Sequence, residues 1–178
     1  VTVTARDRFG NMVPGRTVTL SANGVGNTIA QPAAVTGANG ITTGTIGATA
    51  SGVRTIVASV DGLTVTQQPT LLVTAAPASA VVFTSVPATA VSGASLTPAP
   101  EVGVVDSLGN RNFTFVGAIT LGLAVNPVSG TLSGTLTRNA VTGVASFPGL
   151  SLDRAGSGYT LAASAAGLGG ATSGAITV

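Results

Sequence analysis

The chain of 178 residues contains one pattern twice. Asp7-Arg-Phe-Gly-Asn11 returns as Asp106-Ser-Leu-Gly-Asn110, 99 residues later. Four more pairs of segments follow in the same order at offsets of 101 to 105 residues: 18–20 with 119–121, 39–41 with 142–144, 55–59 with 160–164, and 71–73 with 176–178. Five matches in one order predict two homologous units, so a single fold must account for both halves of the chain.

In both units apolar and polar side chains alternate as they do in β-strands. Val1–Ala5 and Thr17–Ser21 alternate apolar and polar side chains with period two, which is typical of a half-buried strand. The same alternation returns in 55–60, 70–74, 101–105, 118–125 and 159–164. Gly-Asn, Asn-Gly, Asp-Gly and Ser-Gly dipeptides separate these runs, and such dipeptides favour turns. We predict an all-β chain of two tandem β-sandwiches, each with about seven strands.

The composition removes most catalytic chemistry. The chain has no His, Cys, Lys or Trp, so it offers no Ser-His or Cys-His pair and no imidazole or thiolate metal site. Hydrolysis by two carboxylates would have to use Glu101, Asp106 or Asp153, and no pattern places any two of them across a cleft. We predict a protein that is not an enzyme, with no catalytic residue and no cofactor.

Charge patterning argues against two classes of partner. Seven Arg and five acidic residues give a net charge of +2, and the Arg residues are scattered along the chain rather than clustered. A nucleic-acid binder needs clustered cations, so we expect no nucleic acid. The uncharged stretch between Asp61 and Glu101 is interrupted by Pro69, Pro77, Pro87 and Pro98, among others, which a membrane-spanning helix does not tolerate, so we expect no membrane insertion.

The repeat also predicts the domain organisation. We expect an incomplete sandwich over residues 1–74, a short Ala/Pro linker over 75–79, and a complete sandwich over 80–178. The chain has no initiator Met, and Val1 already belongs to an alternating run. We therefore interpret the chain as a segment of a longer protein.

The two units differ at their beginnings. The second unit opens with Pro77 to Pro100, which contains a predicted edge strand at Val81–Ser85. The first unit has six residues before Asp7, so this strand has no counterpart there. Three explanations stay open: the segment is cut there, a neighbouring molecule donates the strand, or the fold tolerates an open edge. Donation would build a head-to-tail filament on the assembly edge formed by Val1, Val3 and Ala5.

A few loop residues are candidates for binding or modification. Asp7 and Asp106 are weak calcium candidates, because calcium prefers six to eight oxygen ligands and each loop offers one Asp and one Asn. An Asx turn followed by a glycine with positive φ explains the same residues, and we expect no metal. Asn112 begins an Asn-x-Thr pattern and is a candidate glycosylation site. Tyr159 suits the tyrosine corner of a sandwich.

The run Asp7 to Asn11 followed by Val13-Pro-Gly-Arg-Thr-Val-Thr-Leu20 resembles the bacterial immunoglobulin-like domains of the invasin and intimin adhesins, the Big-1 group. The second unit is similar to tandem repeats of large bacterial surface proteins, through 143–147 and 155–164. The resemblance implies two tandem immunoglobulin-like β-sandwiches, the first lacking its N-terminal strand, and brings no catalytic residues with it.

The resemblance implies a structural module on the bacterial cell surface or outside the cell. Such repeats act as a stalk or spacer that projects a distal adhesive or catalytic domain. The partners we expect are copies of the chain joined head to tail by a donor strand, which makes a filament subunit, or adjacent repeats of the same chain. The alternative is an adhesin or carbohydrate-binding module of a larger secreted protein.

Overall fold

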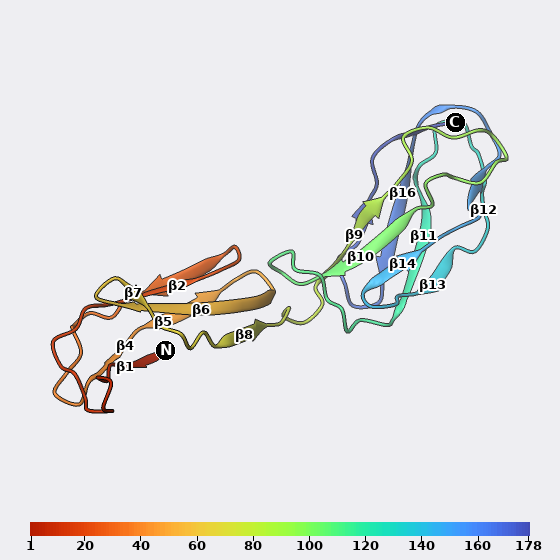
Figure 1. Ribbon diagram of the computed structural model, residues 1–178. Coiled ribbons are helices and arrows are strands. Elements are labelled where there is room, and N and C mark those ends of the chain that lie inside the picture. Colours follow the sequence, from red (N-terminus) through yellow and green to blue (C-terminus); the bar gives the residue numbers. More distant parts are fainter. The chain divides into compact units, whose positions relative to one another are not determined.

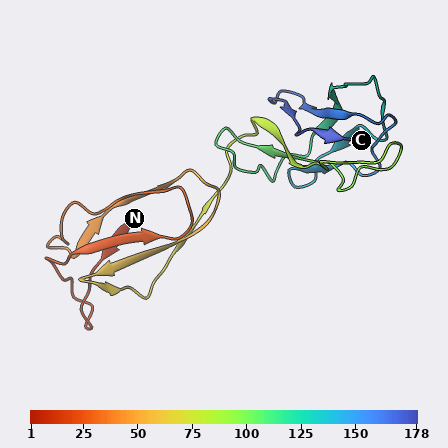
Figure 2. The same cartoon turned by 90° about the horizontal axis from the view of Figure 1, so that it is seen from above.

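The computed structural model describes residues 1–178 and contains eighteen strands and no helix (Figures 1 and 2). The chain divides into two compact units, Val1–Thr74 and Ala75–Val178. This confirms the all-β fold class, which follows from the period-two alternation of small apolar and polar side chains. No helix is present that has the length and hydrophobicity to cross a membrane.

The first unit consists of three antiparallel groups of strands. The first group pairs β1 (Thr2–Thr4) with β4 (Ile41–Thr43). The second contains β2 (Val18–Ala22), β6 (Gly52–Val60), β7 (Leu63–Thr64) and β8 (Thr70–Val73), of which β8 pairs with β6. The third pairs β3 (Asn27–Ala30) with β5 (Thr45–Ala48). In Figure 1 the N-terminus marks one end of β1. Strand β6 is the organising strand of the unit, because β2 pairs along one of its edges and β7 and β8 along the other.

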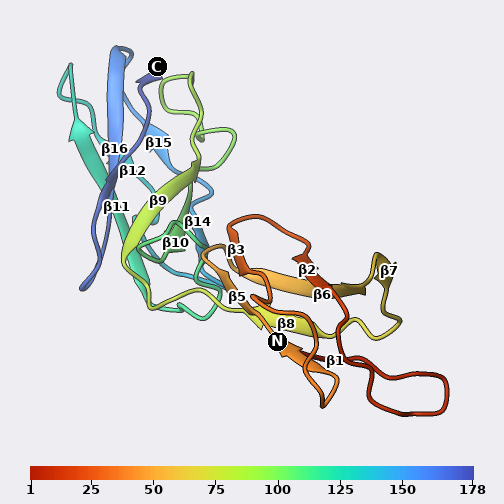
Figure 3. The ribbon, with the colours of Figure 1, turned by 90° about the vertical axis from the view of Figure 1, so that its left-hand side faces the viewer.

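The second unit repeats these groups with two additional strands. The first group contains β9 (Ala80–Ser85), β10 (Glu101–Val105) and β14 (Val144–Ser146). The second contains β13 (Thr137–Asn139), β11 (Ala118–Val125), β16 (Ser157–Ala165), β17 (Ala171–Thr172) and β18 (Ile176–Thr177). The third pairs β12 (Leu132–Ser133) with β15 (Ser151–Leu152). Figure 3 shows β9 crossing in front of β11 and β16, which pair with each other. The additions are β9, which pairs with β10, and β13, which pairs with β11.

The pairing registers of the two units coincide. Val3 faces Thr42 in the β1–β4 pair, and Val102 faces Ala145 in the β10–β14 pair, at the offsets found in the sequence. Likewise Leu20 of β2 faces Ala58 of β6, and their counterparts Leu121 and Ala163 face each other. Because a slip of one residue would turn every side chain to the opposite face, this agreement confirms that both units are one fold.

The hydrophobic cores differ greatly in size. The second unit has a cluster of fifteen buried hydrophobic residues that includes Phe147, Tyr159 and Leu161, each fully buried. The first unit has a cluster of four, Val3, Val18, Leu20 and Ala58. Since burial of apolar surface is the main stabilising contribution to folding, we expect the first unit to be the less stable.

Within the 178 residues, no strand takes the place of β9 in the first unit, and β1 pairs with β4 alone. This is the absent N-terminal strand that the sequence predicts. The predicted linker, 75–79, lies within the second unit, where the Ser79 N–H donates to the Val105 carbonyl at 2.8 Å. Its residues are therefore anchored to the sandwich that follows them.

Candidate strand-acceptor site

Strand β1 has one free edge. The Val1 carbonyl accepts from Gly44 N–H at 3.0 Å, and Ala5 N–H donates to the Gly40 carbonyl at 2.8 Å, so the backbone groups of alternate residues face β4. Backbone groups point to opposite edges along an extended strand, so those of Thr2 and Thr4 face away from β4. No strand pairs with β1 on that side. The free edge therefore presents unused donors and acceptors, as an edge strand does.

A groove follows this free edge. It consists of two adjoining hollows of about 250 and 640 Å³ that share Thr4 and Val65 in their linings. Residues Val1 to Asp7 line one side, and residues from β6, β7 and the segment after β7 line the other: Ile56, Ala58, Val60, Leu63, Thr64, Val65, Gln67 and Pro69. We call this feature the acceptor groove.

The second unit shows what covers the equivalent surface there. Strand β9 pairs with β10 so that Val81 faces Val104 and Val82 faces Gly103. Val81 is 1% exposed, and its N–H donates to the Gly169 carbonyl at 2.9 Å, just before β17. One strand thus closes the edge of β10 and also reaches the other sheet, across the place that the acceptor groove occupies in the first unit.

The residues of the predicted assembly edge take different positions. Val3 and Ala5 point into the unit and are 8% and 7% exposed, whereas Val1 is 39% exposed. The part of the edge that is open to a partner is therefore mainly the backbone of Thr2 and Thr4 together with the groove beside it.

Asp7 and Asp106 form identical Asx turns. Oδ1 of Asp7 accepts from the N–H groups of Phe9 at 2.8 Å and Asn11 at 2.9 Å, and its Oδ2 accepts from Asn11 Nδ2 at 2.9 Å. Asp106 makes the corresponding bonds to Leu108 and Asn110. The following glycines, Gly10 and Gly109, have φ of 88° and 83°, a conformation that glycine adopts without strain.

Neither the Asp7 loop nor the Asp106 loop brings further acidic side chains together as calcium ligands. The N–H donors described above occupy both oxygens of each carboxylate, and no group of three acidic side chains that could hold a metal ion exists in the chain. The other carboxylates considered for hydrolysis are also placed structurally: Asp153 accepts from Thr131 N–H at 2.6 Å, and Glu101 lies on β10. Nothing in the structure joins Glu101, Asp106 and Asp153 in one site.

In the second unit the Asx turn binds an additional group. Asp106 Oδ2 accepts from Ala76 N–H at 2.9 Å, and Asn112 Nδ2 donates to the Ala76 carbonyl at 3.0 Å. The N–H and the carbonyl of Ala76, which precedes β9, are therefore both hydrogen-bonded to side chains. We call Asp106 and Asn112 the clamp. Asn112 is 7% exposed, so glycosylation of its Nδ2 would require this bond to break and the loop to open.

The Asp106 carboxylate of the clamp should make the stability of the second unit depend on pH. The side-chain amide of Asn110 is the largest cause that lowers the pKa of Asp106, from 3.8 to about 2, with backbone N–H donors adding to it. A carboxyl whose pKa is lower in the folded state stabilises that state fully above its unfolded pKa, and this contribution is lost as the pH falls from about 4 to about 2. We expect the melting temperature of the second unit to fall across this range.

The substitution Asp106→Asn tests this prediction. Its amide NH₂ would face the Ala76 N–H and the Asn110 Nδ2, so the melting temperature of the second unit should fall at pH 7. Its decline between pH 4 and pH 2 should become shallower. Thermal unfolding followed over this pH range measures both effects, and Asp7→Asn should act on the first unit instead. An unchanged pH slope would contradict the assignment to Asp106.

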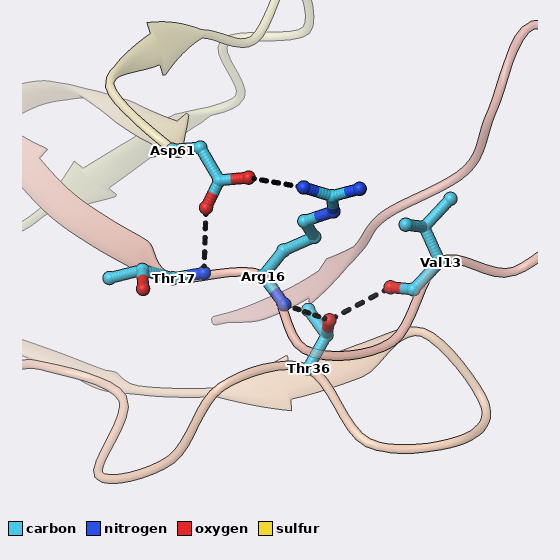
Figure 4. Close-up of polar contacts among 5 residues, drawn as sticks. All are labelled: Val13, Arg16, Thr17, Thr36 and Asp61. Carbon is cyan, nitrogen blue, oxygen red and sulfur yellow. Dashed lines mark hydrogen bonds and ion pairs between the residues drawn. The ribbon is translucent and has the colours of Figure 1, made fainter.

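The turn after β1 is fixed by two side chains that the sequence analysis missed (Figure 4). Thr36, 2% exposed, donates from Oγ1 to the Val13 carbonyl and accepts from Arg16 N–H, both within 2.9 Å. Asp61 accepts from Thr17 N–H at 3.0 Å and pairs with the Arg16 guanidinium at 3.1 Å. These bonds tie the segment between β1 and β2 to parts of the chain 20 to 45 residues away, which no local pattern indicates.

Arg54 and Tyr159 occupy the same position in the two units. Tyr159 is fully buried and its hydroxyl donates to the Arg154 carbonyl at 2.9 Å, which is the tyrosine corner expected from the sequence. Arg54, 105 residues earlier, is 4% exposed. Its guanidinium donates to the carbonyls of Ala50 at 2.6 Å and Val25 at 3.1 Å. An arginine therefore fastens the loop of the first unit where a tyrosine does so in the second.

Several solved structures are similar to this chain. The chain is similar to the Yersinia pseudotuberculosis adhesin InvE (19% identity, TM-score 0.43, covering 99% of this chain and 52% of that chain). It is similar to the Escherichia coli adhesin FdeC (18%, TM-score 0.46, 99% and 58%) and to a beta-glycosidase from Bacteroides vulgatus (15%, TM-score 0.51, 90% and 21%). This chain thus spans about half of InvE and a fifth of the glycosidase. No curated protein matches.

One family model matches part of the chain. Residues 1–74, the whole first unit, match the model of the bacterial Ig-like domain (group 1). The second unit repeats the strand pairs and registers of the first unit and adds β9 and β13. The first unit of this chain thus matches the group 1 bacterial Ig-like domain over its whole length.

Proposed function

We propose that this chain is a non-enzymatic structural module of a bacterial protein located at the cell surface or outside the cell, where it acts as a stalk or spacer. The observation that carries the proposal is the tandem use of one Ig-like fold, of which the first copy matches a bacterial family. Asp7 and Asp106 accept from backbone N–H groups of their own loops, and Asp153 accepts from the Thr131 N–H, 22 residues away; all three act as structural side chains do.

The proposal includes a mode of assembly. A neighbour completes the first unit by adding a strand beside β1, either from an adjacent repeat of the same chain or from another copy joined head to tail. The support is the free edge of β1 and the acceptor groove next to it. Head-to-tail addition between copies builds a filament when the rotation from one copy to the next does not close a ring.

Force spectroscopy on the 178-residue chain tests the spacer. Independent units should unfold in two separate events that release about 250 Å and about 350 Å of chain, from 3.3–3.6 Å per extended residue. A single event for the whole chain would contradict two separate mechanical units. Electron microscopy of the concentrated protein decides between the assembly modes, since copies that donate strands to one another form fibres, whereas completion within one chain leaves single particles.

One hollow in the second unit favours the alternative function, that of an adhesin or carbohydrate-binding module. A cavity of about 720 Å³ lies on the β9–β10–β14 sheet and includes Glu101, Arg111 and Arg138 in its lining. Carbohydrate sites usually stack sugar rings on aromatic side chains, and no aromatic residue lines this hollow. The spacer is therefore the function that the structure supports best.

A further inference from the structure

We infer that the acceptor groove binds one extended, uncharged peptide strand that runs antiparallel to β1, enters beside the Asp7 loop, and has the side-chain pattern of Ala76–Ser85. This inference rests on the proposed function and specifies the partner of its assembly site. The argument is that the second unit holds such a strand, β9, on the equivalent surface. The first unit presents the same receiving strand in the same register.

The register follows from the offset of 99 residues between β1 and β10. Val3 and Ala5 correspond to Val102 and Val104, which face Phe83 and Val81 of β9. The incoming strand therefore places an aromatic or large aliphatic residue opposite Val3 and a β-branched residue opposite Ala5. Its backbone pairs with the free groups of Thr2 and Thr4, because Thr4 corresponds to Gly103, which faces Val82.

The pattern of the strand determines which positions can carry charge. In β9, Val81 is 1% exposed and points into the core, whereas Val82 is 36% exposed and points outward. The residue of the incoming strand that corresponds to Val81 lies opposite Ala5, in the hollow that Val60 and Val65 also line. A charge there would lose its hydration on burial, whereas a charge one residue later would remain in water.

Asp7 supplies the anchor at the point of entry. Asp106 accepts the Ala76 N–H with Oδ2 while that oxygen also accepts from Asn110 Nδ2. Asp7 has the same turn, and its Oδ2 accepts from Asn11 Nδ2. The Asp7 carboxylate is thus placed to accept one backbone N–H of the incoming chain, four residues before the strand begins. The second half of the clamp has no equivalent, because Val13 stands at the position of Asn112.

The test is a full chain with a second copy of residues 75–99 added in front of Val1, so that the added strand has the spacing of β9 to β10. We expect the melting temperature of the first unit to rise by more than about 5 °C, since a gain of one kilocalorie shifts a domain of this size by that order. We also expect hydrogen exchange of the Thr4 amide to slow at least about tenfold, as a newly bonded N–H does.

Two matched variants of the added copy separate specific binding from a general effect of extra chain. With Val81→Asp in the added copy, both gains should be lost. With Val82→Asp in the added copy, both should remain. Asp7→Asn should reduce the gain without abolishing Thr4 protection. No rise in melting temperature, or an equal rise with Val81→Asp, would overturn the inference. These outcomes are independent of whether the original chain forms fibres, so failure of the filament mode is recognised separately.

Discussion

Replacing Arg54 with alanine is expected to unfold the first unit well below its normal melting temperature while the second unit remains folded. Arg54 is 4% exposed and donates to the carbonyls of Ala50 and Val25 and to Asn27 Oδ1 at 2.9 Å. Removing it takes the charged donor away from these acceptors, and each hydrogen bond to a charged group contributes about 1.5–3 kcal/mol. The core cluster of the first unit contains four buried residues, so its stability is small. A loss of several kcal/mol should therefore lower its melting temperature strongly.

Differential scanning calorimetry of the full chain measures this effect, because the two units should give two transitions. Arg8→Ala is the matched control: Arg8 is an exposed residue of the same unit that stacks on Phe9, and its loss should change little. Arg54→Lys keeps the charge and has one donor group in place of the guanidinium fork, so an intermediate loss is expected. A first transition that is unchanged in Arg54→Ala would show that the loop does not depend on this side chain.

The second large effect is expected from Phe147→Ala. Phe147 is fully buried in the core of the second unit, and its backbone N–H donates to the Pro100 carbonyl, a bond that alanine retains. Removal of a buried phenylalanine side chain costs about 3–5 kcal/mol, from lost burial and from the cavity that remains. Urea unfolding of the second unit should show this loss. Phe113→Ala, at a 60% exposed position, should cost less than about 0.5 kcal/mol, and equal losses would contradict the assigned core.

The repeat and the strands were predictable from the sequence, because period-two alternation and turn dipeptides are local signals. The absence of a partner for β1 was predictable too, since the repeat supplies its own complete copy for comparison. Arg54 was not predicted as a buried residue, because arginine normally reads as a surface residue and only its packing reveals otherwise. The offset of 105 that pairs it with Tyr159 was the available signal.

The clamp could not be predicted for a similar reason. Ala75 to Ser79 reads as a linker by composition, and the side chains that hold Ala76 lie 30 and 36 residues further along the chain. The acceptor groove likewise depends on the meeting of β1 with residues around Val65, which the sequence separates by about sixty positions. The sequence draws attention to Asp7 and Asp106 as loop residues, whereas their hydrogen-bond partners came only from the structure.

The clamp has a mechanical consequence. Ala76 is bonded through both its N–H and its carbonyl before β9 begins, so tension that enters from the N-terminal side reaches Asp106 and Asn112 before it reaches any β-ladder. Both side chains belong to the segment that follows β10, so the force is transmitted to β10 inside the sandwich. The first strand of the second unit is consequently shielded from being peeled away from its end, and a pull on the chain must first break a pair of side-chain bonds to a single alanine.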